Sequence, residues 1–205
     1  MKILAVSDRV ENSLLERAAN LLPAQPDLIL GCGDLPPEYL TELRKFYEVP
    51  LYFIQGNHDI RHNASPPVGC SDIHATIVKE QDLHILGFKG SRWYNGEANQ
   101  FTEGEMKKII RGLWFRRFWS RRPDIIISHA PPRFIHDQED PCHKGFRSFT
   151  ALIKKWKPTW FLHGHIHELF NDPADRITTV CETQVINCYG YFFFDTEIAG
   201  QAAGS

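Results

Sequence analysis

The sequence contains no hydrophobic run long enough for a membrane helix or a secretion signal. A membrane-spanning helix needs about 20 apolar residues, and no segment of this 205-residue chain approaches that length. The N-terminal apolar run, residues 3–6, is interrupted by Ser7-Asp8 and is too short for the core of a signal peptide. We therefore expect a cytoplasmic protein without a membrane partner.

The cysteines do not form a recognisable pattern. There are five of them, an odd number, and no Cys-x-x-Cys spacing occurs. This usage favours reduced thiols and argues against a disulfide framework. A bridge between Cys181 and Cys188 across a terminal hairpin is the less favoured alternative.

The charge is also nearly balanced. The formal net charge is −2 and the pI is near 6.5, so no overall attraction to nucleic acid or anionic lipid is expected. One segment, residues 111–122, interleaves five arginines with four aromatic residues. This segment would suit a nucleic-acid surface, but we favour a helix with its aromatic residues inward and its arginines in solvent.

The remaining composition is that of one ordinary globular domain. Hydrophobic residues make up 42% and charged residues 23% of the chain, and no repeat or low-complexity segment is present. We expect one domain over residues 1–197 and a disordered tail over residues 198–205.

Strand and helix patterns alternate in the first quarter of the chain. Ser13 and Glu16 form a capping box for a helix, and Pro36-Pro37 opens a second one. Such alternation predicts an α/β fold with a parallel sheet. The expected strands are residues 2–6, 27–30 and 49–55.

Predicted helices and strands also alternate in the rest of the chain. Thr102 and Glu105 form another capping box before an amphipathic helix, and residues 146–156 predict a further helix. The expected strands here are residues 75–79, 83–88, 124–128, 159–162, 177–181, 184–188 and 191–194.

Polar side chains come within a few residues of the ends of five expected strands. These residues are Asp8; Asp34; Asn57 and His58; His129; and His165 with His167. In proteins with parallel sheets, substrates and cofactors bind at the carboxyl ends of the strands. We therefore expect these side chains to lie along the same edge of the sheet. Carboxylate, amide and imidazole ligands without thiolate suit Mn²⁺, Fe²⁺/Fe³⁺, Zn²⁺ or Ni²⁺. Six ligands exceed the four of one tetrahedral ion, which favours a pair of divalent ions.

The order of these motifs, through Gly33-Asp34, Gly56-Asn57-His58-Asp59 and Gly164-His165-Ile166-His167, resembles the calcineurin-like metallophosphoesterase superfamily. The resemblance spans about residues 1–190. It implies a four-layer α/β/β/α sandwich with two mixed β-sheets and a dinuclear metal site. It also implies that Asp34 bridges the metals, that Asp8 and His167 hold the first, and that Asn57, His129 and His165 hold the second.

The sequence departs from the family pattern at one position. The family's first motif is Asp-x-His, and here it reads Asp8-Arg9-Val10. Valine cannot ligate a metal, so the first site loses an imidazole while the second stays complete. We therefore expect unequal sites, the second filled and the first weak and dependent on added metal.

The resemblance further implies that His58 is the outer-sphere catalytic histidine, with Asp59 beside it. Two cations neutralise a phosphoryl group and supply hydroxide for in-line attack, and His58 protonates the leaving oxygen or stabilises the transition state. Arg61, His62, Arg92 and His143 are candidates for substrate contact. We expect His163 to be a core residue rather than a ligand.

The sequence is compatible with two functions, of which we favour one. The favoured one is a metal-dependent phosphoesterase acting on a diester or monoester, with a small phosphoester or nucleotide as substrate. The alternative is a degenerate scaffold or binding module without turnover, which Val10 favours and the intact His58, Asn57 and C-terminal histidines oppose. The substrate, the metals and the oligomeric state stay open.

Overall fold

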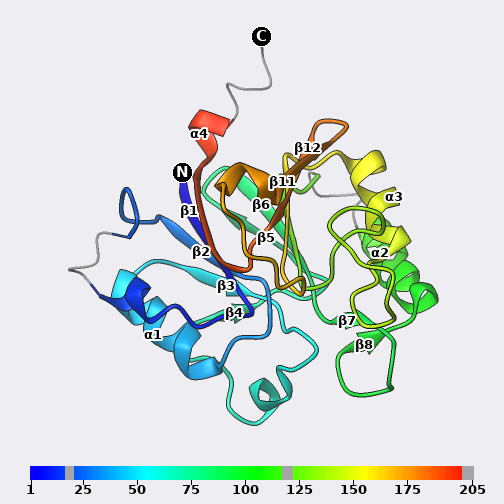
Figure 1. The fold of residues 1–205 in the computed structure, drawn as a ribbon, viewed down its shortest axis with the longest axis horizontal. Helices are drawn as coiled ribbons and strands as arrows, with labels where there is room; N and C mark the ends of the chain where they lie inside the picture. The colour runs from blue at the N-terminus through cyan, green and yellow to red at the C-terminus, as the bar shows by residue number, and fades with distance from the viewer. Residues whose placement is uncertain (17–20, 117–121, 200–205) are drawn as a thin grey trace.

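The computed structural model describes residues 1–16, 21–116 and 122–199, which form two β-sheets that face each other between helical layers (Figure 1). The first sheet has the strand order β13-β1-β2-β3-β4. β1 to β4 run parallel, while β13 pairs antiparallel with β1. Their bounds are β1 Lys2–Ser7, β2 Leu28–Gly31, β3 Leu51–Phe53, β4 Ser71–Asp72 and β13 Gly190–Asp195.

The second sheet has the order β11-β12-β10-β9-β6-β5. Its four central strands are parallel and its two edge strands antiparallel, so both sheets are mixed. The bounds are β5 Ile77–Glu80, β6 Leu83–Phe88, β9 Ile125–Ser128, β10 Trp160–His163, β11 Ile177–Val180 and β12 Thr183–Asn187. A small ribbon pairs β7 Ser91–Arg92 with β8 Gln100–Phe101.

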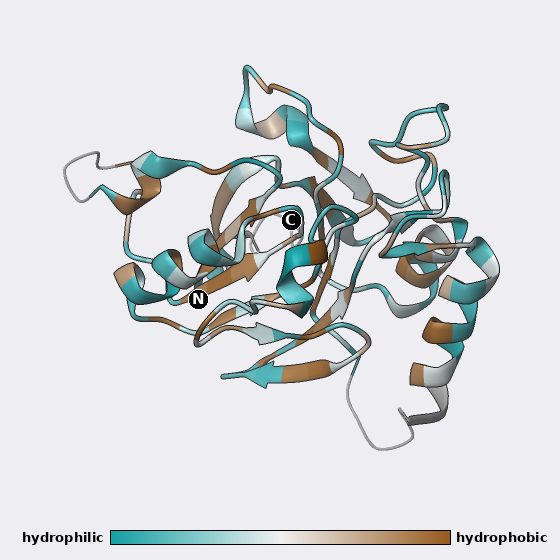
Figure 2. Ribbon diagram, turned by 90° about the horizontal axis from the view of Figure 1, so that it is seen from below, coloured by the Kyte–Doolittle hydropathy of each residue, from teal (hydrophilic) through white to brown (hydrophobic). Residues whose placement is uncertain are grey.

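Three apolar clusters define the layers. The first lies between the two sheets and includes Ile3, Leu30 and Ile127. The second packs the other sheet face against α2 Glu103–Arg116 and α3 Arg147–Trp156, and the third packs β1 to β3 against α1 Pro37–Tyr47. In Figure 2 the hydrophobic colour lies mainly on the central strands, while the helices alternate between hydrophobic and hydrophilic faces. The predicted four-layer sandwich with two mixed sheets is confirmed.

The helix expected from Ser13 is wrong over the described residues. A short 3₁₀ helix, η1 Asn12–Leu15, occurs instead, and Glu16 is extended with φ −105° and ψ 108°. Two tyrosines of α1 explain the difference. The Tyr39 hydroxyl accepts from the Glu11 amide and donates to the Glu11 carbonyl. The Tyr47 hydroxyl donates to the carbonyl of Leu14 at 2.7 Å. The bond from Tyr47 satisfies the Leu14 carbonyl, which would accept a backbone bond in the expected helix, and the bonds from Tyr39 fix the backbone just before it. Residues 17–20 lie outside the described part.

Other local predictions are confirmed. Pro37 begins α1, and the capping box forms with Thr102 Oγ1 accepting from the Glu105 amide and the Glu105 carboxylate accepting from the Thr102 amide. The cysteines are free, Cys181 and Cys188 included. Of the basic-aromatic stretch, residues 111–116 belong to α2, and residues 117–121 lie outside the described part.

The remaining elements are short. They are η3 Ile60–Asn63, η5 Pro173–Arg176 and α4 Thr196–Ala199. The first two residues of the predicted tail thus belong to α4, next to the N-terminus, and residues 200–205 are not described. No helix within the described ranges combines the length and apolar character needed to cross a membrane.

Candidate metal centre

The candidate ligands lie where five strands end. Asp8, Asp34 and Asn57 follow β1, β2 and β3, and His129 and His165 follow β9 and β10. β1 to β3 are parallel within one sheet, as β9 and β10 are within the other, so each set delivers its residues to one edge. Three of the candidate ligands, Asp8, Asp34 and His165, have left-handed backbone with φ of 63°, 54° and 68°. Such conformations cost energy in non-glycine residues and cluster at functional sites.

Glycines allow the strand ends to approach each other. A Cβ on Gly33 would lie 2.6 Å from His129 Nδ1 and 2.7 Å from the Gly56 amide nitrogen. A Cβ on Gly164 would overlap Ser7 Oγ and the Asp8 carboxylate. Gly33 and Gly164 directly precede Asp34 and His165, so the lack of a side chain at each glycine makes room for the candidate ligand that follows.

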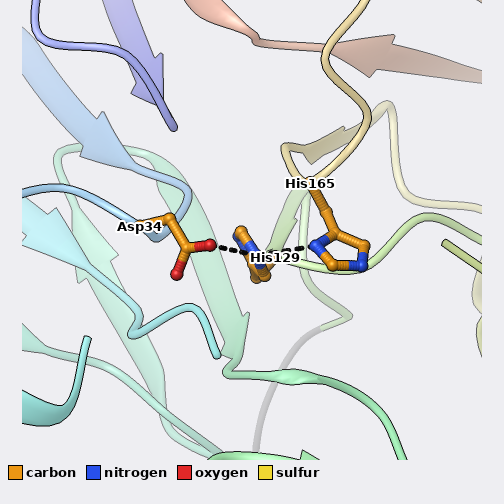
Figure 3. A group of neighbouring side chains, drawn as sticks. All are labelled: Asp34, His129 and His165. Atoms are coloured by element: carbon orange, nitrogen blue, oxygen red, sulfur yellow. Dashed lines mark hydrogen bonds and ion pairs between the residues drawn. The ribbon is translucent and has the colours of Figure 1, made fainter. Parts of the chain in front are cut away.

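Three of the predicted ligands, Asp34, Asn57 and His165, meet around one nitrogen atom of a fourth, His129 Nε2; Figure 3 draws Asp34, His129 and His165. Asp34 Oδ2 lies 3.2 Å from it, Asn57 Oδ1 3.1 Å and His165 Nδ1 3.1 Å. His129, His165 and Asn57 are buried. This cluster is the set predicted for the second metal together with the predicted bridging carboxylate.

Hydrogen bonds on the far side of each ring indicate which nitrogen carries the proton. His129 Nδ1 lies 3.0 Å from the carbonyl of Cys32, and His165 Nε2 lies 2.8 Å from the carbonyl of Cys142. Carbonyl oxygens only accept, so these two nitrogens carry the hydrogens of the neutral rings. The lone pairs of His129 Nε2 and His165 Nδ1 then face each other and two oxygens. A bound cation stabilises this arrangement, which otherwise needs an extra proton.

The pKa shifts of His129, His165 and Asp34 also indicate that this cluster favours a positive charge. Burial lowers the pKa of His129, but the adjacent Asp34 carboxylate outweighs it and raises the pKa to about 9. Burial and the His129 charge lower the pKa of His165 to about 4. Burial raises the pKa of Asp34, but His129 lowers it well below the ordinary value. The shifts of the three pKa values thus favour one positive charge among these side chains.

Asp8 and His167 form a separate pair. His167 Nε2 lies 3.3 Å from Asp8 Oδ1, and this bond raises the pKa of His167. The Asp8 carboxylate also accepts from the His165 amide, at 2.9 Å. Val10, where the family has its histidine, is 39% exposed. The residues predicted for the first site thus lie beside the four-residue cluster as a pair without a third side-chain ligand from Val10.

His58 and Asp59 have different surroundings. His58 is exposed, and its backbone amide donates to Asp34 Oδ1 at 2.8 Å. Asp59 is buried, and its Oδ2 accepts from the amides of Asp34 at 2.7 Å and Gly56 at 2.8 Å. Burial raises the pKa of Asp59. Its contacts make Asp59 an anchor for the loops that carry Asp34 and Asn57.

Three of the residues predicted to contact substrate lie in different parts of the structure. The His143 ring lies 5.3 Å from that of His165, next to the cluster, and its Nδ1 bonds Asp140. The Arg61 guanidinium is exposed and paired with Glu38 of α1. Arg92 lies half-buried in β7. Of the three, the structure brings His143 next to the cluster.

His62 was also a candidate for phosphate contact, and its burial argues against that prediction. It is 3% exposed, with Nε2 2.8 Å from the Leu35 carbonyl and 3.5 Å from Asp59 Oδ1. His163 is fully buried as expected, and its Nε2 lies 2.8 Å from His136 Nδ1. His136 Nε2 in turn lies 2.8 Å from Thr178 Oγ1.

One residue at the cluster was not recognised from the sequence. The Tyr94 hydroxyl accepts from Asn57 Nδ2 at 3.4 Å, which leaves Asn57 Oδ1 facing His129. Tyr94 also interacts with the Cys142 thiol, and the Cys142 carbonyl holds His165. Residues 90–96 contain two aromatic residues, Trp93 and Tyr94, and no local pattern indicates which of them reaches the cluster.

The profile of the calcineurin-like phosphoesterase family matches residues 1–169. The chain belongs to this family. A solved structure of TT1561 from Thermus thermophilus superposes on this calcineurin-like phosphoesterase with a TM-score of 0.67, covering 97% of this chain and 95% of that one at 16% identity. At that identity the likeness concerns the fold.

Two curated relatives are similar in sequence. One is the UPF0046 protein K07C11.7 of Caenorhabditis elegans, 22% identical over 82% of this chain and 64% of its own length. The other, named "probable glycerophosphodiester phosphodiesterase GpdQ", is from Arcobacter nitrofigilis and is 27% identical over 73% of this chain and 60% of its own length. The matches thus span less than two thirds of both relatives.

Proposed function

We propose that this calcineurin-like phosphoesterase hydrolyses a small phosphodiester or phosphomonoester with divalent metal ions held at the strand ends. The observation that carries the proposal is the meeting of Asp34, Asn57 and His165 around His129 Nε2, with every separation between 3.1 and 3.2 Å. The donor set fits Mn, Fe, Zn or Ni, because it combines imidazole with oxygen ligands.

The two metal positions differ in the proposal. Asn57, His129 and His165 would hold the second ion, and Asp34 would be shared. Asp8 and His167 would hold the first ion, with no imidazole from position 10. When bound, divalent ions neutralise phosphoryl oxygens and make water a stronger nucleophile at neutral pH.

The side chains of the protein supply the remaining functions. The carbonyls of Cys32 and Cys142 orient the His129 and His165 rings, so that one lone pair of each faces the site. His58 is exposed beside the cluster and is held there through its amide bond to Asp34. From that position its imidazole can give a proton to the leaving oxygen. Asp59 holds the two loops together.

A second candidate function is a scaffold without turnover, and Val10 is the observation that favours it. The complete second cluster and the exposed His58 favour the hydrolase. The test is Mn²⁺-dependent hydrolysis of para-nitrophenyl phosphate and of the bis-para-nitrophenyl ester, with a chelator-treated sample as control. We expect turnover of at least one ester that the chelator abolishes. Bound metal without turnover of either ester would support the scaffold.

A further inference from the structure

A cavity of about 330 Å³ adjoins the Asp8–His167 pair. Arg9 and Glu168, which line it, are the residues that follow Asp8 and His167 directly. Tyr189 also lines the cavity, and its ring stacks on the His167 imidazole with centroids 4.9 Å apart and planes at 28°. The cavity therefore lies next to the predicted first metal position. Its lining includes none of the candidate metal ligands and not His58, so the proposed function assigns it no role.

The walls of this cavity are mainly aromatic and aliphatic. Leu169 is 78% exposed and Leu21 is 38% exposed, although exposed apolar surface of this kind is unfavourable in water. Such side chains around a concave site indicate a surface that is covered when a ligand binds. The further apolar lining is provided by Leu22, Phe170, Tyr191, Phe192 and Phe193.

One wall is held firmly in place by Arg176. Its guanidinium lies over the Phe170 ring at 4.7 Å, and its Nη1 donates to the Tyr191 carbonyl at 2.8 Å. The ring of Phe170 is thus fixed between an arginine and the cavity. At the polar rim, Arg9 Nε pairs with Glu11 Oε1 at 3.0 Å, and Glu168 supplies a further carboxylate that can accept hydrogen bonds.

We propose that this cavity binds the base of a nucleoside phosphate whose phosphoryl group lies at the metal-ligand cluster, an inference that rests on the proposed function. Planar bases stack on aromatic side chains, and the rim carboxylates can accept from their amino groups. The volume lies at the lower end of the roughly 300–1,000 Å³ of ligand pockets, which suits a base rather than a long acyl chain.

The experiment compares two ligands that differ only by the base, adenosine 5′-monophosphate and ribose 5-phosphate. Binding is measured by isothermal titration calorimetry in the His58→Ala background, so that slow turnover does not consume the ligand. The pocket variant is Phe170→Ala, with Phe170→Leu as a second variant that keeps apolar volume if the first does not fold. The matched control is Phe134→Ala, because Phe134 also lies under an arginine guanidinium, at 4.2 Å from Arg133, but outside the cavity.

We expect the nucleotide to bind at least about fivefold more tightly than ribose 5-phosphate, as loss of one base–aromatic stack would predict. Phe170→Ala or Phe170→Leu should remove most of that advantage, and Phe134→Ala should keep it. Equal binding of the two ligands by the His58→Ala protein, or equal loss in the Phe134 variant, would overturn the proposal. Hydrolysis of the para-nitrophenyl esters tests the phosphoesterase function separately, since those esters carry no nucleobase.

Discussion

His129 Nε2 and His165 Nδ1 face each other at 3.1 Å, while the opposite nitrogen of each ring lies against a backbone carbonyl. The two imidazoles come from different strands of one sheet, and Asp34 of the other sheet lies 3.2 Å from the same His129 nitrogen. Neutral rings held in this way present two lone pairs to one point. The arrangement is therefore oriented for a cation, and the following predictions test that orientation.

The first prediction concerns metal content. Purified protein should contain about one tightly held divalent ion per chain, because the second cluster is complete and the Asp8–His167 pair is not. His129→Ala should weaken binding by more than about 100-fold, beyond the usual effect of outer-sphere partners. Elemental analysis after dialysis and titration calorimetry measure both quantities.

The control for this variant is His84→Ala, since His84 pairs with Asp124 at the start of β6, away from the strand ends. It should keep the parent metal content. Two stoichiometric, non-exchangeable ions per parent chain would contradict the prediction that the two sites differ in metal affinity.

The second prediction restores the missing ligand. Val10→His should raise the affinity of the first site by at least about tenfold, because it returns an imidazole near Asp8 and His167. Val10 is partly exposed, so the change should cost little stability. Titration of a second equivalent of Mn²⁺ measures the effect, with Val10→Ala as the matched control. An unchanged second equivalent would mean that the position 10 side chain does not reach the site.

The residue patterns predict an α/β fold and the strand-end placement of the candidate ligands, while the four layers are implied by the family resemblance. Buried strands have continuous apolar runs, and Asp34, Asn57 and His129 come soon after the ends of such runs. Parallel pairing of β2 with β3 brings Asp34 and Asn57 to one sheet edge, and the packing of the two sheets brings His129 to the same place. Capping at Thr102 is equally local, since donor and acceptor lie three residues apart.

What could not be predicted depends on contacts between distant segments. The expected helix at Ser13 gave way to backbone bonds from Tyr39 and Tyr47, which lie 28 and 33 residues further along the chain than the residues they bond. Tyr94 reaches Asn57 from a loop 37 residues away. No periodicity in either segment encodes these partners, because they are chosen by tertiary packing.

The third prediction separates catalysis from metal binding. His58→Ala should lower turnover by about 10²–10⁴-fold, the usual contribution of a positioned acid or base. The metal content should stay at the parent level, because the contact of His58 with Asp34 runs through its backbone amide. Ester hydrolysis and elemental analysis on the same sample decide the matter. Loss of metal together with turnover would make His58 a ligand.

The fourth prediction concerns Asp59 as an anchor. Asp59→Ala leaves the amides of Asp34 and Gly56 without their acceptor, and each such group costs about 1–3 kcal/mol when buried. We expect a matching loss in the free energy of unfolding and weaker metal binding. Asp59→Asn keeps an acceptor oxygen and should recover most of both. If the Asn variant retained metal and stability but lost turnover as completely as the Ala variant, Asp59 would act in the chemistry.

The last prediction is a pH dependence away from the metal ligands. Burial, with Lys89 as a second cause, lowers the pKa of His74 to about 4, and its Nδ1 accepts from the Lys89 amide at 3.1 Å. Above pH ~6.5 the ring is neutral in both the folded and the unfolded chain. As the pH falls from about 6.5 toward 4, the unfolded chain binds the proton first, so stability is lost across this window.

The loss from this histidine should be on the order of 1–3 kcal/mol, with partial solvent exposure favouring the lower end. His74→Asn keeps an acceptor for the Lys89 amide but cannot be protonated. Denaturant unfolding at pH 7 and pH 4.5 should therefore show a smaller difference for the Asn variant than for the parent. Chelator-treated samples remove the contribution of bound metal from both. Parallel losses in the two proteins would show that His74 is protonated equally in the folded and unfolded chains, despite its burial between Asp72 and Lys89.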